Sequence, residues 1–182
     1  MTMKLCIDPG HGMLNASPQR YDPGAVFQAH EEASLVLDYA ILLWAACAAS
    51  GIDAVLTRRK RDEPMPLQRR VEFALEKGCT TMLSLHANAA GNLQAHGTET
   101  LYRRDATFAA LMQQAAVSAL GLRDRGIKPR PGLAVLKFPG PCALIELGFI
   151  TNNDDRAVMM SKRTQFRFAQ AVAKALTQGG WE

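Results

Sequence analysis

Apolar positions along this chain follow two different spacings. Short apolar runs bounded by glycine, proline or polar residues are typical of buried strands, whereas apolar residues three or four positions apart are typical of helices. The expected strands are residues 4–8, 53–57, 80–86 and 98–103, with two more near 133–137 and 143–146. The expected helices are residues 32–50, about 67–77, 106–120, 154–160 and 164–177.

Strands that alternate with helices predict an α/β fold. We expect a mostly parallel, twisted sheet of about six strands with helices on both faces. A chain of 182 residues is long enough for one sizeable core and short for two, so residues 1–182 are interpreted as a single domain. In such sheets ligands bind beyond the carboxyl ends of the strands, which is where candidate chemistry should be sought.

Composition and charge narrow the class of protein. Apolar residues make up 48% of the chain and charged residues 21%, which excludes a disordered or fibrous chain. The net charge of +4 favours an anionic partner. The one compact basic run, residues 58–63, ends in two acids and has no interleaved aromatic residues. It is therefore interpreted as a solvated loop, and no nucleic-acid partner is expected.

Several features bear on the cellular location. Residues 1–4 lead directly into a strand, without the apolar segment of a secretory signal, so we expect a cytoplasmic protein. The apolar run 35–49 is alanine-rich and broken by Asp38, so stable membrane insertion is not expected. The cysteines form no closely spaced pair, and we expect them to be reduced and mostly buried. They are Cys6, Cys47, Cys79 and Cys142.

Three of the predicted strands end in residues that can bind a metal. The first runs into Asp8-Pro-Gly-His11-Gly, the third ends at His86, and the last contains Glu146. A further glutamate opens the first long helix. Two histidines and two glutamates match a catalytic zinc site, which has three protein ligands, an open position and a carboxylate for proton transfer. Taken alone, a histidine at a strand end is more often structural than a metal ligand.

Two adjacent glutamates compete for the helix position. Glu31 shares its helix face with the polar residues Ser34 and Asp38. Glu32 shares its face with residues expected to pack on the sheet, namely Leu35, Val36, Tyr39 and Leu43. Periodicity therefore favours Glu32 as the ligand, and Glu31 stays open as the alternative.

The surroundings of these residues lead to further expectations. Glu146 follows an apolar run, and a buried carboxylate without a partner costs several kcal/mol, so it needs a metal site or an arginine nearby. Asp8 is expected to cap the turn at the strand end, and Gly12 to leave space beside His11. We interpret His30 and His96 as surface residues.

Two residues near His86 have open roles. Ser84 and Asn88 flank this histidine at the end of its strand. They are candidates for hydrogen bonds that orient its ring, with a purely structural role as the equal alternative.

Seven segments, taken together and in order, resemble a known family. The resemblance is to the zinc-dependent N-acetylmuramoyl-L-alanine amidases of the third amidase family. Two departures are Leu75, where the family often has asparagine, and Met13, where a third glycine is common. The segments are IDPGHG (7–12), YDPGA (21–25), Glu32 with Leu35 and Leu37, LTR (56–58), SLHAN (84–88), GTETLY (97–102) and IELGFITN (145–152).

The resemblance implies a site and a reaction. It implies that His11, Glu32 and His86 bind one zinc ion and that Glu146 is the catalytic carboxylate. The implied substrate is peptidoglycan, cleaved at the amide that joins the lactyl group of N-acetylmuramic acid to L-alanine. We further expect a monomeric phage lysin, cytoplasmic before its release.

Two other functions stay open from the residues alone. A zinc carboxypeptidase would need an arginine to hold the terminal carboxylate of its substrate, and Arg103, Arg104 and Arg130 are candidates. A non-catalytic wall-binding module is the other alternative, and the presence of Glu146 in an apolar strand counts against it.

Overall fold

The computed structural model describes residues 3–17 and 20–179, and its centre is a six-stranded sheet. The strand order is β6-β1-β7-β10-β8-β9. The first four strands are parallel to one another, whereas β8 is antiparallel to β10 and parallel to β9. The expected α/β fold with a mostly parallel sheet is confirmed. The bounds are β1 Lys4–Pro9, β6 Asp53–Leu56, β7 Thr81–Asn88, β8 Thr98–Tyr102, β9 Asp124–Pro129 and β10 Cys142–Phe149.

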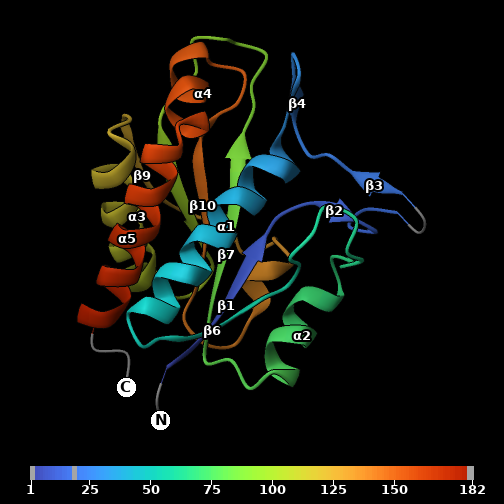
Figure 1. Cartoon of the computed structure of the whole chain (residues 1–182), viewed down its shortest axis with the longest axis vertical. Coiled ribbons are helices and arrows are strands. Elements are labelled where there is room, and N and C mark those ends of the chain that lie inside the picture. The colour runs from blue at the N-terminus through green and yellow to red at the C-terminus, as the bar shows by residue number, and fades with distance from the viewer. Residues whose placement is uncertain (1–2, 18–19, 180–182) are drawn as a thin grey trace.

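Helices cover both faces of the sheet, but unequally. The larger core lies between one face and the helices α1 (Glu32–Ala49), α3 (Ala106–Leu120) and α5 (Lys162–Gln178). The smaller core lies on the other face, under α2 (Arg69–Glu76) and the 3₁₀ turn η1 (Val135–Lys137). Figure 1 shows α1 and α5 on one side of β1 and α2 on the other. The helix α4 (Asn153–Met160) follows β10, and the short hairpins are β2–β3 (Gly12–Met13 with Tyr21–Asp22) and β4–β5 (Val26–Phe27 with His30–Glu31).

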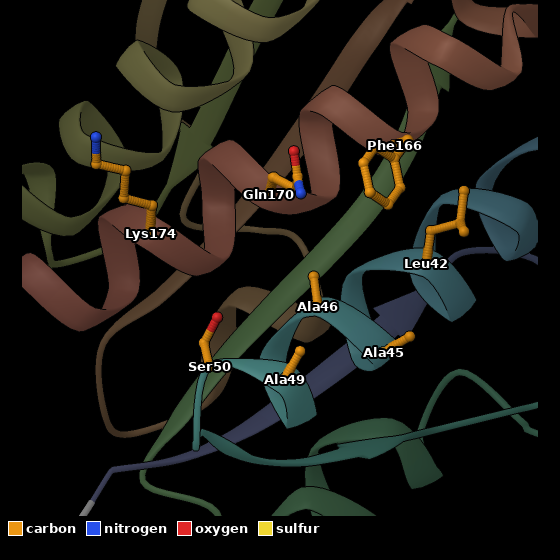
Figure 2. A pocket seen from close by; sticks show the side chains of 8 residues that line it. All are labelled: Leu42, Ala45, Ala46, Ala49, Ser50, Phe166, Gln170 and Lys174. Atoms are coloured by element: carbon orange, nitrogen blue, oxygen red, sulfur yellow. The ribbon is translucent and has the colours of Figure 1, made fainter.

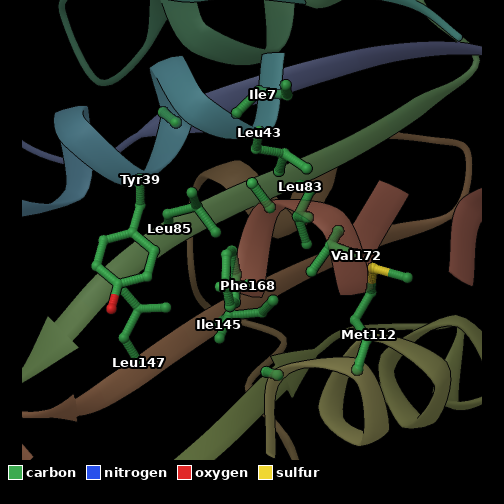
Figure 3. Close-up of a cluster of buried hydrophobic side chains, with 14 of the residues drawn as sticks. Ile7, Tyr39, Leu43, Leu83, Leu85, Met112, Ile145, Leu147, Phe168 and Val172 are labelled. Atoms are coloured by element: carbon green, nitrogen blue, oxygen red, sulfur yellow. The ribbon is translucent and has the colours of Figure 1, made fainter. Parts of the chain in front are cut away.

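Alternation along the strands assigns side chains to these two faces. Leu83 and Leu85 of β7 point into the larger core, as does Ile145 of β10 (Figure 3). Their sequence neighbours therefore point to the opposite face, where the smaller core contains Met82 and Leu144. Continuing the same alternation along these two strands puts His86 and Glu146 on the face of the smaller core, near the carboxyl ends of the strands.

The long helix α1 is a helix of the core. By length and composition alone it could cross a membrane, a criterion that core helices also meet. Tyr39 is fully buried, stacks edge-on against Phe168 of α5 at 5.1 Å between ring centroids, and donates a hydrogen bond to the Met159 carbonyl. At the C-terminal end of α1, a groove between α1 and α5 is lined by Leu42 and three alanines of α1 and by Phe166, Gln170 and Lys174 of α5 (Figure 2). The helix thus owes its apolar composition to packing.

The prediction of a strand at 133–137 is wrong, and a strand that was not predicted, β9, lies just before it at Asp124–Pro129. Val135 and Leu136 are buried, but they belong to the 3₁₀ turn η1, which packs on the smaller core. A short apolar run alone does not distinguish such a turn from a strand. The sixth strand is instead β9, which is mostly polar and pairs only with β8 at the edge of the sheet. Polar edge strands have weak hydrophobic patterns because they bury little side-chain surface.

The cysteines behave as expected. Cys6, Cys47, Cys79 and Cys142 are all free thiols and all buried. Burial raises the pKa of the Cys47 thiol to about 12, which leaves it protonated at neutral pH.

Candidate metal and catalytic site

Three side chains distant in the sequence converge beyond the carboxyl end of β1. His11 follows β1, Glu32 is the first residue of α1, and His86 lies on β7. Oε1 of Glu32 lies 3.0 Å from Nε2 of His11 and 2.9 Å from Nδ1 of His86. One ligand atom from each residue fits within a span of 4.8 Å. The three predicted metal ligands are therefore brought together.

The neighbouring glutamate points elsewhere. Glu31 accepts a hydrogen bond from the Tyr21 hydroxyl at 3.1 Å and pairs with Arg61 at 2.9 Å. Glu32 is only 4% exposed, and its Oε1 also accepts a hydrogen bond from the backbone N–H of Ala87. Glu32, rather than Glu31, therefore lies in the cluster, as the periodicity of the helix indicates.

Asp22 determines which nitrogen of His11 faces the cluster. One carboxylate oxygen of Asp22 lies 2.9 Å from Nδ1 of His11 and accepts a hydrogen bond from Asn15, while the other accepts from the N–H of Gly24. An ionised carboxylate can only accept, so Nδ1 of His11 carries a proton and donates it to Asp22. In the neutral ring the lone pair of Nε2 then faces Glu32.

The cluster has the electrostatics of a cation site. Burial opposes ionisation of Glu32, but hydrogen bonds and charge from His11 and His86 outweigh it and hold its pKa well below the usual range. Burial lowers the pKa of His11, and Glu32 and Asp22 together raise it above its ordinary value. A buried carboxylate facing two imidazoles needs positive charge at the centre, either protons or a metal ion. The set of two imidazoles and one carboxylate fits a zinc ion.

Glu146 lies beside this cluster with an unpartnered oxygen. It is the register neighbour of His86 on the adjacent strand. Its Oε2 is buried and finds no hydrogen-bond partner within the described part of the chain. Burial raises its pKa to about 7, helped by the charges of Glu32 and Glu99 and opposed by those of His86 and His11. A carboxyl group with a pKa near neutrality is suited to both accepting and donating a proton.

Comparison with known proteins identifies the family. A family model described as N-acetylmuramoyl-L-alanine amidase matches residues 5–178. The chain belongs to this amidase family. The amidase LytC of Bacillus subtilis is 33% identical over 176 residues, which cover 92% of this chain and 34% of LytC. The chain therefore spans about a third of the length of that curated relative.

Solved structures of amidases share the fold. The catalytic domain of CwlV, an amidase from Bacillus (Paenibacillus) polymyxa var. colistinus, is 30% identical, with a TM-score of 0.87 and 98% of each chain covered. The amidase AmiC2 of Nostoc punctiforme is 27% identical, with a TM-score of 0.86, covering 97% of this chain and 96% of that one. The amidase fold thus accounts for nearly the whole chain.

A buried ion pair supports the loop that carries His11, at residues 9–12. The Asp8 carboxylate is fully buried and pairs with Arg70 at 2.5 Å, while Thr57 and Ser84 each donate a hydrogen bond to it at 2.7 Å. Arg70 also donates to the carbonyls of Pro9 and His11. The expectation that Asp8 caps the turn is wrong, because a neighbouring guanidinium group holds the carboxylate beneath the loop.

A second buried arginine connects the loop to α1. Arg58 is 0% exposed and donates to the carbonyls of Pro9, Gly10 and Ala33, the last being the residue after Glu32. The expectation that residues 58–63 form a solvated loop is therefore wrong at its first position. Arg58 connects the backbone around His11 to the helix start that carries Glu32.

Two glycines allow close approach around His11. A Cβ atom on Gly10 would lie 2.2 Å from the His86 ring, so only glycine fits there. A Cβ atom on Gly12 would meet the Arg58 side chain at 2.8 Å, so the missing side chain of Gly12 leaves room for Arg58. His11 itself has a φ of 60°, a left-handed conformation that is uncommon outside glycine. The hydrogen bonds from Arg58 and Arg70 hold the backbone in this conformation.

Other expected residues lie outside the cluster. The hydroxyl of Ser84 contacts Asp8, and the amide of Asn88 lies 3.4 Å from Glu99, so neither supplies His86 with a hydrogen bond. His96 is exposed, as expected, whereas His30 is half-buried in β5. The partner of His86 is Glu32.

Asp22 lies within the matched segment YDPGA, but no local pattern in the sequence predicts its contact with His11. Aspartate is common in turns before Pro-Gly, so its residue type alone carries little signal. The fold shows its contact with His11 because the β2–β3 hairpin brings Asp22 opposite Gly12.

Proposed function

We propose that this chain is a zinc-dependent peptidoglycan amidase that cleaves the bond between N-acetylmuramic acid and L-alanine. The single observation that carries the proposal is the unpartnered, buried Oε2 of Glu146 beside the cluster of His11, Glu32 and His86. A structural carboxylate would be expected to have a partner at this depth. The choice of this amide bond, and of peptidoglycan as the substrate, rests on membership of the amidase family.

His11, Glu32 and His86 would hold the metal. A zinc ion bound by three protein ligands supplies Lewis-acid chemistry, making water more acidic and polarising a carbonyl group. Asp22 accepts a hydrogen bond from the Nδ1–H of His11, which keeps the proton on Nδ1 and leaves the Nε2 lone pair available. Glu32 is ionised at neutral pH, because its pKa is held low by the two histidines.

Glu146 would move the proton during hydrolysis. In its ionised form it accepts a proton from the attacking water, and it then donates that proton to the nitrogen of the departing L-alanine. The second transfer is needed because an amine anion is a poor leaving group. Burial raises the pKa of Glu146, which suits a carboxyl group that both accepts and donates a proton.

The arrangement of arginines disfavours a carboxypeptidase that uses the predicted residues. Arg103 and Arg104 directly follow Tyr102, which pairs with Ala143 of β10. Ala143 lies three residues before Glu146, so the two arginines begin about 10 Å along the strand from the catalytic carboxylate. The N–H of Arg130 donates to the Tyr102 carbonyl, which places Arg130 at the same distant end. A role as a monomeric phage lysin held in the cytoplasm stays a prediction, and a neighbouring gene for a membrane pore would support it.

Digestion of purified peptidoglycan tests the proposed reaction. Mass analysis should find free stem peptides that begin at L-alanine, and both a zinc chelator and the substitution Glu146→Ala should abolish them. New ends within the glycan, or within the peptide, would contradict the bond assignment.

Replacing Asp22 with alanine should weaken zinc binding by about 10- to 100-fold, because His11 loses the acceptor that fixes its tautomer. Competition with a chromophoric chelator measures this affinity. Asp38→Ala is the matched control, since that exposed carboxylate pairs only with Lys162 in the described structure. Equal zinc affinity in the two variants would show that Asp22 does not orient His11.

A further inference from the structure

The candidate catalytic residues continue across the sheet as a row. His86 on β7 is the register neighbour of Glu146 on β10, and Glu146 is the register neighbour of Glu99 on β8. Adjacent strands are about 4.8 Å apart, so this row extends about 10 Å from the metal cluster toward the β9 edge.

Two cations at the end of the row share one carboxylate. Oε2 of Glu99 lies 2.6 Å from Nε of Arg125 and 2.5 Å from Nζ of Lys128. The Glu99 side chain is 8% exposed, whereas those of Arg125 and Lys128 are 26% and 31% exposed. The group therefore has one surplus positive charge, and it lies on the two side chains that solvent can reach.

A bulge in β9 aims Arg125 at this position. Thr98 pairs with Asp124 and Thr100 pairs with Ile127, so Arg125 and Gly126 together oppose the single residue Glu99. Bulges of this kind redirect a side chain and are frequent beside active sites. The guanidinium group also stacks over the Phe149 ring at 4.9 Å, which limits its movement.

We propose that Arg125 and Lys128, held in place by Glu99, form a subsite that binds a carboxylate of the stem peptide. This inference rests on the proposed amidase function, and it adds the direction in which the substrate lies. The lactyl group would lie toward the metal cluster, and the peptide would run across β10 and β8 toward β9. A peptide advances about 3.5 Å per residue, so the cations would reach the second or third residue after the scissile amide.

Two synthetic muramoyl tripeptides test this subsite. Their second and third residues carry carboxylates in one substrate and carboxamides in the other. The wild-type chain should cleave the carboxylate form with a kcat/KM about tenfold higher, mainly through KM, because charge-assisted hydrogen bonds stabilise its binding. This preference should shrink as the salt concentration rises.

Lys128→Met should reduce the preference to about twofold or less, because the loss in kcat/KM falls mainly on the carboxylate form. Lys137→Met is the matched control, because Lys137 is exposed at the end of η1, and it should keep the preference. Equal cleavage of both substrates by the wild type, an unchanged preference in Lys128→Met, or an equal loss on both substrates would overturn the subsite. Failure of the wild type to release either peptide would instead contradict the proposed amidase function.

Discussion

Replacing Glu146 with glutamine should lower kcat by about a thousandfold while leaving zinc binding unchanged. General acid and base catalysis typically contributes factors of about 10² to 10⁴, and glutamine can neither accept nor donate the proton. Steady-state cleavage of a soluble muramoyl peptide measures kcat, and metal analysis of the same sample measures zinc. A variant that keeps more than a tenth of the activity would exclude Glu146 as the proton carrier.

The same substitution should stabilise the metal-free protein, but only at higher pH. Burial raises the pKa of Glu146 to about 7, above the ordinary value of 4.5. The folded state therefore favours the neutral acid, an advantage that is fully present below about pH 4.5 and is lost as the pH rises through about 7. Glutamine stays neutral, so it should raise the free energy of unfolding by on the order of 3 kcal/mol at pH 8 and by little at pH 4.

Urea unfolding of both proteins at the two pH values measures this difference. A gain that is equal at pH 4 and pH 8 would indicate a packing effect instead of a buried carboxyl group. If glutamine lowers kcat and stabilises the fold only at high pH, the ionised Glu146 carboxylate that catalysis needs also destabilises the folded chain.

Replacing Arg70 with alanine should destabilise the fold by about 3–5 kcal/mol, because it leaves the Asp8 carboxylate buried without its counter-ion. Arg70 is 1% exposed and Asp8 is 0% exposed, so bulk solvent does not screen the charge of the carboxylate in the folded chain. The hydrogen bonds from Arg70 to the Pro9 and His11 carbonyls are lost as well, so zinc affinity should also fall.

The adjacent residue provides a matched control. Arg69 is exposed and pairs with Glu72 and Glu76 on the surface of α2, so Arg69→Ala should change the stability by no more than about 0.5 kcal/mol. Chemical unfolding of the two variants measures the contrast between neighbouring positions of one helix. Similar losses in both would mean that the pair of Asp8 and Arg70 has no special role beneath the loop.

Local patterns could predict the strands that build the site but not everything around it. Residues of β7 and β10 form apolar runs that end in His86 and Glu146, so their positions follow from strand period and from the rule that ligands gather at carboxyl ends. Glu32 follows from the face of α1 that packs on the sheet. In each case a local pattern carries the information.

The unpredicted parts depend on contacts between distant segments. Arg58 and Arg70 look like ordinary surface charges in the sequence, and only the fold shows them buried beneath the loop of His11. Strand β9 buries few side chains, so its sequence lacks the apolar alternation that marks a strand. Hydrophobic patterns therefore could not predict that Arg125 and Lys128 of β9 lie beside Glu99.

Metal content measured by inductively coupled plasma mass spectrometry tests the central claim most directly. After removal of metal and reloading with zinc, the wild-type chain and Glu146→Gln should each retain one zinc ion per chain, and His86→Ala should retain less than about a tenth of that. Circular dichroism confirms that the His86→Ala chain is folded before the measurement. Full zinc occupancy in folded His86→Ala, or none in the wild type, would contradict a metal site built from His11, Glu32 and His86.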